Sequence, residues 1–461
     1  MKQIQNISIE NPKPSQLGNI VKLKINKLGM NGEGVARLDN KVVFVNFALP
    51  DEVVEAEIVA ENSSFLTAKL LRVISPSPHR IEPKCPYFSI CGGCMLQNLE
   101  YAKQLEFKKM LVEETLEKIT GHKFHVYNTI ASPNQFEYRN KISLNFGFED
   151  GKISLGYHLP KSKEFFKITN CSLFPLGLDR MLEFLCKFAN DEHFQVYNPK
   201  NNKGIFKGVV LRQLDRKMSI TFIVKRPVKI NGKKFVEDFK KEQIFNHEIS
   251  LYMNIDTNKN STLLTPKNFY IAGQKELETI ENGLFLSYSN LSFCQINRGV
   301  KNLLYDFVLS ELDESEVVVN AYSGAGHLSA ILAQKSKQVY GLEMVQKATD
   351  NANKMKARNK ISNLENINGN CEKTLPPLLH KIKNACIVLD PPRSGIGKNL
   401  LKSIVENSDR INKIIYVSCN SISLAKNIKT LLEKFDVETV QPFDMFPQTA
   451  KIETVVILTK K

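Results

Sequence analysis

The sequence predicts a multidomain protein: a small β-barrel, then a central α+β domain, then an α/β domain with a parallel sheet. The barrel is predicted because short β-rich segments alternate with turns rich in glycine, asparagine and proline from residue 18 to about residue 73. The α/β domain is predicted because apolar strands alternate with helical segments from about residue 290. The length of 461 residues suits about two to four domains.

The barrel is expected over residues 14–74, after a polar start that is predicted to be disordered. Its β-rich segments are "NIVKLKINKL", "KVVFVNFAL" and "EVVEAEIV", and the turns between them include "GMNGEG" and "LPDE". Strands of this length and spacing are typical of a small barrel. The proline-rich stretch "SPSPHRIEP" then predicts a linker over residues 75–83.

The central domain is expected over residues 75–270, and it mixes helices with strands. Residues 100–120, "EYAKQLEFKKMLVEETLEKIT", predict an amphipathic helix, which we expect to pack on the third domain. The β-rich pieces that follow include "KISLNFGF", "ISLGYHL", "GVVLRQL" and "SITFIVKR". This mixture predicts an α+β architecture.

The third domain is expected over residues 271–461. Its predicted strands are apolar along their whole length, which is typical of a parallel sheet covered by helices on both faces. The last two strands, "DVETVQPF" and "TVVILT", have no helix of ordinary length between them. We therefore expect these two strands to pair as an antiparallel edge.

The charge and the cysteine count restrict the partner and the compartment. Lys and Arg outnumber Asp and Glu by 63 to 48, which gives a net charge of +15 and suits a polyanionic partner, although a Lys-rich composition also follows genomic bias. A stretch of about 20 apolar residues is lacking, so no membrane span is expected. Nine cysteines and a start without an apolar signal segment predict a reducing compartment, the cytoplasm. Nothing in the sequence indicates an obligate protein partner.

A glycine-containing turn and an acidic residue predict a nucleoside cofactor. In "NAYSGAGHLS", Gly324 and Gly326 allow a ligand to approach the backbone, and Glu343 ends the next strand, where a carboxylate can accept hydrogen bonds from ribose hydroxyls. The turn is neither G-x-G-x-x-G nor a P-loop, which disfavours NAD and ATP. The combination fits S-adenosylmethionine, and a structural turn with a surface Glu is the alternative.

A thiol and carboxylates are expected at one edge of the predicted sheet. Asp390 and Cys419 follow adjacent predicted strands, and Glu453 begins the last one. A cysteine in a strand-to-helix turn, such as Cys419, is more often a small buried hydrophobe. Here the combination of a thiol with carboxylates suits methylation of uracil at C5. A thiolate adds to C6 and activates C5, and a base, for which Glu453 is the leading candidate, then removes the C5 proton. Arg393 in "DPPR" stands where amino-methyltransferases have an aromatic residue, which disfavours methylation of an exocyclic amine.

Six motifs in order resemble those of the RNA uridine-5 methyltransferase family: "FCQIN", "YSGAG", "GLE", "LDPPRSG", "YVSCN" and "DMFPQTAKIET". The resemblance implies a Rossmann-like class I methyltransferase domain with Cys419 as nucleophile and Glu453 as base. It also implies that the donor, S-adenosylmethionine, contacts Gln295, Tyr322, Glu343 and Asp390. The front of the chain resembles the TRAM domain, an RNA-binding barrel of the OB type, and "YRNKI" recurs at the start of the family's central domain.

The segment "CPYFSICGGC" places Cys85, Cys91 and Cys94 within ten residues, which is enough for a metal site if a fourth ligand comes from elsewhere. Spacing alone does not distinguish zinc from iron–sulfur. In larger members of the family this pattern implies a [4Fe-4S] cluster, here with a structural role, and Cys171 fits the place of the fourth ligand. Cys186, in the apolar helical stretch "MLEFLCKFA", is interpreted as a core residue. Cys294, Cys371 and Cys386 are interpreted as packing residues.

The resemblance predicts an enzyme that methylates C5 of a uridine in RNA, most plausibly in 23S ribosomal RNA, through a covalent adduct between Cys419 and C6. The alternatives are a tRNA uridine-5 methyltransferase and an RNA-binding or assembly factor with a weakened catalytic domain. Retention of both Cys419 and Glu453 disfavours the weakened factor. A cytosine-5 RNA methyltransferase is disfavoured because the loop "DPPR" lacks the Pro-Cys motif of those enzymes. The chain departs from the family pattern at Asn320, Ser323, Asn370, Ser421, Gln448 and Lys451.

Overall fold

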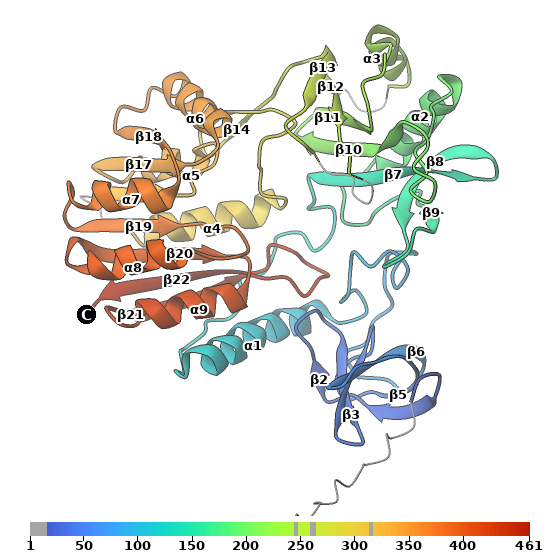
Figure 1. The fold of residues 1–461 in the computed structure, drawn as a ribbon, viewed down its shortest axis with the longest axis horizontal. Helices are drawn as coiled ribbons and strands as arrows, with labels where there is room; N and C mark the ends of the chain where they lie inside the picture. Colours follow the sequence, from blue (N-terminus) through green and yellow to red (C-terminus); the bar gives the residue numbers. More distant parts are fainter. Residues whose placement is uncertain (1–15, 244–247, 259–263, 313–316) are drawn as a thin grey trace, which may run out of the picture. The chain divides into compact units, whose positions relative to one another are not determined.

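The computed structural model describes residues 16–243, 248–258, 264–312 and 317–461 (Figure 1). The predicted disordered start of the chain lies outside these residues. The chain divides into two compact units. The first holds the described residues up to Pro83 together with Met95–Glu100, and the second holds Lys84–Cys94 and Tyr101–Lys461.

The first unit is a six-stranded sheet with the strand order β1-β5-β6-β4-β3-β2. Only the pair β4–β6 is parallel. Buried residues alternate with more exposed ones along the strands, so that one face encloses an apolar core around Val43, Val54 and Leu66. The strands are β1 (Ile20–Lys24), β2 (Lys27–Leu28), β3 (Gly34–Leu38), β4 (Lys41–Val45), β5 (Val53–Glu61) and β6 (Phe65–Ser75).

The second unit begins with a seven-stranded sheet in the order β13-β12-β11-β10-β7-β8-β9, in which only β11 and β12 are parallel. Phe194 stacks on Phe206 with ring centroids 3.6 Å apart, inside a core that also contains Phe222 and Phe235. The region is α+β, in line with the sequence prediction. Its elements are β7 (Lys141–Glu149), β8 (Lys152–His158), β9 (Phe165–Lys167), α2 (Leu178–Asp191), β10 (Phe206–Leu214), β11 (Lys217–Val224), α3 (Gly232–Lys241), β12 (Glu248–Ile255) and β13 (Asn268–Gly273).

The last part of the chain is a second seven-stranded sheet in the order β18-β17-β16-β19-β20-β22-β21. Helices cover both faces: Ile387 packs into a core with residues of the helices on one face, while its neighbour Cys386 packs into the core on the other. A hairpin, β14 (Leu277–Glu281) and β15 (Leu284–Tyr288), and α4 (Arg298–Ser310) precede this sheet. The sheet and its helices are β16 (Val317–Ala321), α5 (His327–Leu332), β17 (Gln338–Glu343), α6 (Gln346–Arg358), β18 (Leu364–Asn368), α7 (Cys371–Leu379), β19 (Ala385–Leu389), α8 (Lys398–Glu406), η1 (Ser408–Arg410), β20 (Ile411–Ser418), α9 (Ser421–Leu431), β21 (Phe435–Phe443) and β22 (Glu453–Lys460).

The final two strands pair antiparallel, as predicted, but β22 is not at the edge. It lies between β20 and β21 and is antiparallel to both. The burial of the strands gives the reason. The first six residues of β22 are all buried, which suits a strand covered on both faces, whereas after its first residue β21 has four residues that are exposed or half-buried.

The helix α1 (Tyr101–Thr120) joins the core on one face of this sheet through Val112 and Leu116 and packs mainly against α9. The chain that follows α1 runs beside β21, with bridges from Val126 to Val440 and from Ile130 to Phe443. This segment covers the edge of the sheet that β21 would otherwise leave unpaired.

Candidate active site

Strand pairing brings Cys419 and Glu453 to the same level of the sheet. Cys419 directly follows β20 and Glu453 is the first residue of β22. The residues next to them, Ser418 and Thr454, are partners in the antiparallel register. Asp390 directly follows β19, which is the strand on the other side of β20. The thiol and the two carboxyls that the sequence predicts in one crevice therefore stand on three consecutive strands.

The three groups are close enough for each to affect the ionisation of another. Burial raises the pKa of the Cys419 thiol, Glu453 and Asp390 raise it further, and the Arg393 guanidinium opposes them. Burial also raises the pKa of Glu453 well above its usual range, with a further contribution from Asp390 and opposition from Arg393. Burial raises the pKa of Asp390 to about 7. Arg393 is thus one cation near this group of acids. Lys451 is another, since Cys419 opposes the lowering of the Lys451 pKa by burial.

The turn that carries Cys419 is fixed by hydrogen bonds to the loop after β19. Asn420 caps α9, because its side chain accepts a hydrogen bond from the Ile422 amide at 3.1 Å. Its Nδ2 donates to the carbonyl oxygen of Arg393 at 2.9 Å, and the Ser423 hydroxyl donates to the same oxygen at 3.0 Å. The loop with Asp390 and the turn with Cys419 are therefore held together as one structure.

A pocket opens beside the glycine turn, and we call it the glycine-turn pocket. Three of the four predicted donor residues line it: Gln295, Tyr322 and Asp390. The other lining residues are Tyr288, Phe293, Cys294, Lys301, Tyr305, Asn320, Ser323, Gly324, Ala325, His327 and Leu328. Through Asp390 this pocket reaches the group of acids that also contains Glu453 and Cys419.

The fourth predicted donor residue, Glu343, lies just outside the lining and supports the turn. Its carboxylate accepts hydrogen bonds from the amides of Gly324, at 2.9 Å, and Val345, at 2.7 Å. Gly326 has a φ of +83°, and a Cβ atom at this position would lie only 2.8 Å from the Cβ atom of Ala352. The turn thus needs glycine here for both its conformation and its packing.

Sequence reasoning assigned no site role to three polar residues of the glycine-turn pocket, Asn320, His327 and Lys301, although it named Asn320 as a departure from the family pattern. Asn320 is only 1% exposed, and its Oδ1 atom has no hydrogen-bond partner within the described part of the chain. The same holds for Nε2 of His327, whose pKa is lowered to about 3, first by burial and then by Lys301 and Arg298. The sequence carried one usable signal, since His327 directly follows the glycine turn. Lys301 had none.

The cysteines interpreted as packing residues behave differently from one another. Cys371 and Cys386 are buried in the cores on the two faces of the sheet. Cys294 instead lines the glycine-turn pocket, where Nδ2 of Asn140 approaches its sulfur to 3.6 Å. The interpretation of Cys294 as a simple packing residue was therefore incomplete, because the residue is also part of a pocket wall.

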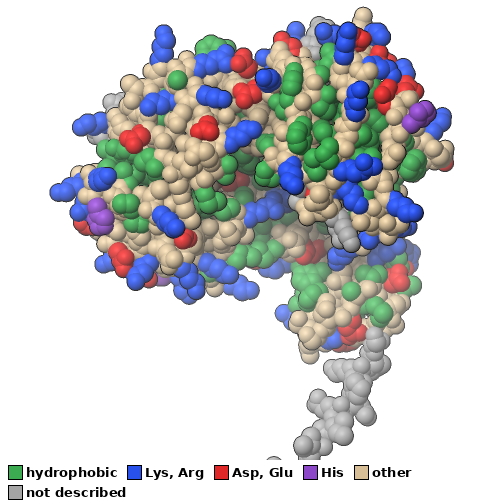
Figure 2. Space-filling view, turned by 45° about the horizontal axis from the view of Figure 1, so that its top comes forward, with side chains coloured by type: hydrophobic (Ala, Val, Ile, Leu, Met, Phe, Trp, Pro, Cys, Tyr) green, Lys and Arg blue, Asp and Glu red, His purple; other side chains and the backbone are tan. Residues whose placement is uncertain are grey.

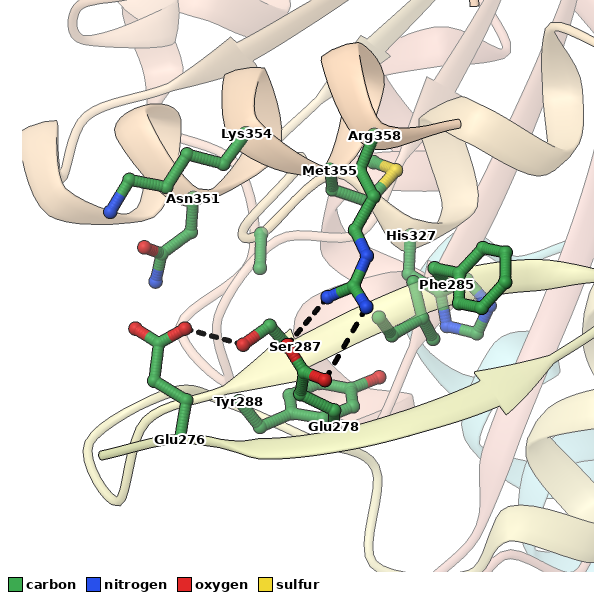
Figure 3. Close-up of a pocket in the computed structure, with 12 residues that line it drawn as sticks. Glu276, Glu278, Phe285, Ser287, Tyr288, His327, Asn351, Lys354, Met355 and Arg358 are labelled. Atoms are coloured by element: carbon green, nitrogen blue, oxygen red, sulfur yellow. Dashed lines mark hydrogen bonds and ion pairs between the residues drawn. The ribbon is translucent and has the colours of Figure 1, made fainter. Parts of the chain in front are cut away.

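A second pocket lies between the β14–β15 hairpin and α6 (Figure 3), and it shares Tyr288, Ala325 and His327 with the glycine-turn pocket. Across it, Arg358 of α6 forms two hydrogen bonds with Glu278 of the hairpin, at 2.5 and 3.3 Å. The hairpin is thus held against α6, and its residue Tyr288 is part of the wall that the two pockets share.

The four predicted metal ligands lie in one neighbourhood. Burial raises the pKa of Cys91, and Cys171 and Cys85 raise it further. Burial likewise raises the pKa of the buried Tyr157 hydroxyl, with contributions from Cys171, Cys91 and Cys94. The Tyr87 hydroxyl is hydrogen-bonded to the Thr169 side chain at 3.0 Å and accepts from the Thr169 amide at 2.9 Å. This contact ties the first three cysteines to the loop with the fourth.

As placed, however, the described residues include no group of three His, Cys, Asp or Glu side chains at the spacing of a metal site. Cys186 lies on α2 beside the central core, and burial raises its pKa to about 11 with no contribution from the other cysteines. Cys171 rather than Cys186 therefore belongs to the neighbourhood of Cys85, Cys91 and Cys94.

Basic side chains are spread over the surface of the second unit. Figure 2 shows Lys and Arg across the face in view, with Asp and Glu between them. This distribution agrees with the net charge of +15 and suits contact with a polyanion. None of the helices that the structure describes is long and apolar enough to cross a bilayer.

The mostly parallel sheet, the glycine turn after β16 and the acidic residue that ends β17 are features of a methyltransferase that uses S-adenosylmethionine. Comparison with family models identifies the group. The model described as "tRNA (Uracil-5-)-methyltransferase" matches residues 100–461, and the TRAM domain model matches residues 9–71. The chain therefore belongs to the RNA uracil-5-methyltransferase family and carries an N-terminal TRAM domain.

Relatives and a solved structure agree with this assignment. The chain is 31% identical over 456 residues to an uncharacterized RNA methyltransferase of Clostridium tetani, with 97% of both chains covered. It is 32% identical over 455 residues to one of Clostridium acetobutylicum, with 97% of this chain and 98% of the relative covered. The crystal structure of Pyrococcus abyssi tRNA (uracil-54, C5)-methyltransferase in complex with S-adenosyl-L-homocysteine matches with a TM-score of 0.76 at 24% identity, and covers 95% of this chain and 100% of that chain. The predicted fold of the TRAM and methyltransferase domains is thereby confirmed.

Replacing Arg393 tests the electrostatics around Cys419. The variant Arg393→Met keeps most of the side-chain volume but removes the charge that lowers the pKa of the thiol. Alkylation of Cys419 by iodoacetamide should then be several-fold slower at pH 8, and its pH midpoint should move upward. The measurement is mass spectrometry of the Cys419 peptide over a pH series. Arg358→Met, which removes a cation from the second pocket, should leave the midpoint unchanged. An unchanged midpoint in Arg393→Met contradicts the assignment.

Proposed function

We propose that this protein methylates C5 of a specific uridine in RNA, with 23S ribosomal RNA favoured, through a covalent bond between Cys419 and C6 of the base. The observation that supports this most directly is the position of Cys419 and Glu453 next to each other, one residue beyond the Ser418–Thr454 pair of β20 and β22. Asp390, which lies near both residues, lines a pocket suited to the methyl donor. The proposed place of action is the cytoplasm, where thiols stay reduced.

The reaction needs a nucleophile because uracil C5 is a poor one by itself. The Cys419 thiolate adds to C6 and pushes the π electrons of the ring into an enolate, and C5 of the enolate takes the methyl group from the sulfonium of the donor. Arg393 supports the thiolate, since its charge opposes the neighbouring carboxyls. Without this cation the pKa of the Cys419 thiol would be raised further, and the thiolate would be scarcer at neutral pH.

The reaction ends when a base removes the proton from C5. Glu453 is the proposed base: the C5–H electrons then restore the C5–C6 double bond, and the sulfur of Cys419 leaves as a thiolate. Burial raises the pKa of Glu453 well above its usual range, so the ionised carboxylate is a stronger base than an exposed glutamate. Both groups must lose a proton to act, and both have a raised pKa. Activity should therefore rise from neutral to mildly alkaline pH.

The donor is proposed to bind along the glycine turn. Glu343 would accept hydrogen bonds from the ribose hydroxyls, while Gln295, Tyr322 and Asp390 line the pocket. The unpartnered atoms Oδ1 of Asn320 and Nε2 of His327 suit the charged amino-acid end of the donor. The target base must leave its stack to reach Cys419, so a loop uridine or a flipped base is expected.

Ribosomal RNA is favoured because the TRAM domain and the cysteine cluster resemble the branch of the family that acts on it. tRNA is the second candidate. It is supported by the solved neighbour, which is named for uracil-54 of tRNA and aligns with 95% of this chain. A catalytically weakened RNA-binding factor fits less well, because Cys419 and Glu453 are both present and adjacent.

The cysteine neighbourhood is proposed to hold a [4Fe-4S] cluster through Cys85, Cys91, Cys94 and Cys171. Four thiols are the donor set of such clusters, although zinc accepts the same set. The contact between Tyr87 and Thr169 already brings the two cysteine-bearing segments together. The iron–thiolate bonds of the cluster would cross-link these segments, and the cluster would thus have a structural role.

Comparing RNA from cells with and without the gene tests the substrate. We expect one 5-methyluridine in 23S ribosomal RNA to be absent when the gene is deleted and restored when it is returned. The measurement is mass spectrometry of nuclease fragments of ribosomal RNA and of tRNA. A loss confined to tRNA selects the second candidate, and unchanged 5-methyluridine in both contradicts the proposed function.

Variants of the two reacting residues test the covalent mechanism. Glu453→Gln should transfer the methyl group but fail to release the RNA, because the C5 proton stays on. A methylated protein–RNA adduct should therefore survive a denaturing gel, and turnover should fall about a hundred- to ten-thousandfold. Cys419→Ala and the double variant should form no adduct, while donor binding persists in both. Normal turnover of Glu453→Gln without an adduct would exclude Glu453 as the base, with Asp390 next in line.

Metal analysis tests the cluster. Protein purified without oxygen should be brown, with about four iron atoms per chain and broad visible absorbance. Replacing Cys171 with Ser should lower the iron content, whereas the matched change Cys186→Ser should not. Stoichiometric zinc without iron, or equal iron in the two variants, would contradict the assignment.

A further inference from the structure

The loop of residues 444–452 joins β21 to β22 and leads directly into Glu453. It contains no helix or strand, yet most of its residues are buried. Side chains from earlier parts of the sequence bind it, including Asn297, whose Nδ2 donates to the Met445 carbonyl oxygen at 3.4 Å, and three others. Two of them, Gln104 and Lys108, lie one turn apart on α1, and the third is Tyr138, whose hydroxyl donates to the Pro447 carbonyl oxygen at 3.0 Å.

Gln104 and Gln448 form a closed pair of hydrogen bonds. Nε2 of Gln104 donates to Oε1 of Gln448, and the backbone amide of Gln448 donates to Oε1 of Gln104, both at 3.0 Å. Gln104 is completely buried. Gln448 has a φ of +69°, in the left-handed region that residues other than glycine rarely adopt. Gln104 therefore stabilises a backbone conformation that the loop sequence by itself disfavours.

Lys108 fixes the start of the same loop. Its ammonium forms an ion pair with Asp444, and both side chains are completely buried. It also donates to the Phe446 carbonyl oxygen at 3.1 Å. Burial lowers the pKa of Lys108, while Asp444 acts in the opposite direction. Buried ion pairs are costly to desolvate, and their best-attested use is to specify one arrangement of the chain.

We propose that Gln104 and Lys108 are positioning residues for Glu453, which set the place of the carboxylate by fixing the 444–452 loop. This inference rests on the proposed function, in which Glu453 takes the C5 proton. In that step the C5–H bond breaks, its electrons re-form the C5–C6 double bond, the C6–S bond breaks to the Cys419 thiolate, and the proton passes to Glu453. The atom of the base that accepts the proton must lie within about 2.6–3.2 Å of the atom that carries it. A displacement of about 1 Å can cost a hundredfold in rate.

The variant Gln104→Met tests the proposal, because it keeps the side-chain volume but removes both hydrogen bonds. Release of the RNA should slow about ten- to a hundredfold, so that the covalent adduct accumulates, while the first methyl transfer changes only a few-fold. Gln448→Met loses only the side-chain bond and should accumulate less adduct. The assay uses methyl-labelled S-adenosylmethionine and total RNA from cells lacking the gene, with single-turnover labelling and denaturing gels.

Thr115→Val is the matched control. It also removes a buried polar group of α1, but the Thr115 hydroxyl donates only to the Leu111 carbonyl oxygen of the same helix, at 2.6 Å. It should give no adduct. The proposal is supported if the amount of adduct is highest in Gln104→Met, lower in Gln448→Met and zero in Thr115→Val. Equal slowing of methyl transfer and release in Gln104→Met, or loss of folding in Gln104→Met together with an adduct-free, fully active Gln448→Met, overturns it.

Glu453→Gln separates this proposal from the function on which it rests. If Glu453→Gln traps the adduct and Gln104→Met does not, the base assignment stands and the positioning role fails. If Glu453→Gln traps none, the base assignment fails and the positioning role fails with it.

Discussion

The rest of the site depends on the antiparallel insertion of β22 between β20 and β21. A parallel strand in the same place would have put its first residue at the far end of the sheet, because parallel strands all start at one edge. The reversed direction brings the start of β22 to the edge where β16, β19 and β20 end. Glu453 thereby lies beside Cys419, one residue beyond the Ser418–Thr454 pair, and Asp390 beside them lines the pocket of the glycine turn.

Burial of the ionisable groups at this end of the strands disfavours their charged forms, and these include the groups proposed to react. Burial raises the pKa values of Asp390, Glu453 and Cys419, and Asp390 raises those of Glu453 and Cys419 further. Arg393 is a counter-charge, and its carbonyl oxygen accepts hydrogen bonds from Asn420 and Ser423 of the turn that carries the thiol. The backbone that positions the cation is thus bound to the backbone that positions the nucleophile.

The same edge is connected to the central region through the segment 138–140. The Arg139 amide donates to Leu173 O at 2.8 Å, and the Asn140 amide donates to Ile296 O at 3.0 Å. The first contact leads to the loop of Cys171 and the second to the segment of Gln295. A cluster held by the cysteines would therefore support, through ordinary backbone hydrogen bonds, one wall of the pocket in which the donor is proposed to bind.

Sequence alone predicted the elements that carry the site and the residues proposed to react, because local patterns encode them. The apolar run before Cys419 and the capping residue after it placed the thiol in a strand-to-helix turn, and the order of motifs gave the family. Only the tertiary structure decided four features: the interior position of β22, the pocket role of Cys294, the unpartnered atoms of Asn320 and His327, and the contacts of Gln104 and Lys108 with the 444–452 loop. Each of these involves groups far apart in the sequence: Gln104 and Gln448 are 344 residues apart. No local pattern records such a pairing, since it forms only when the faces of α1 and the sheet meet in the folded chain.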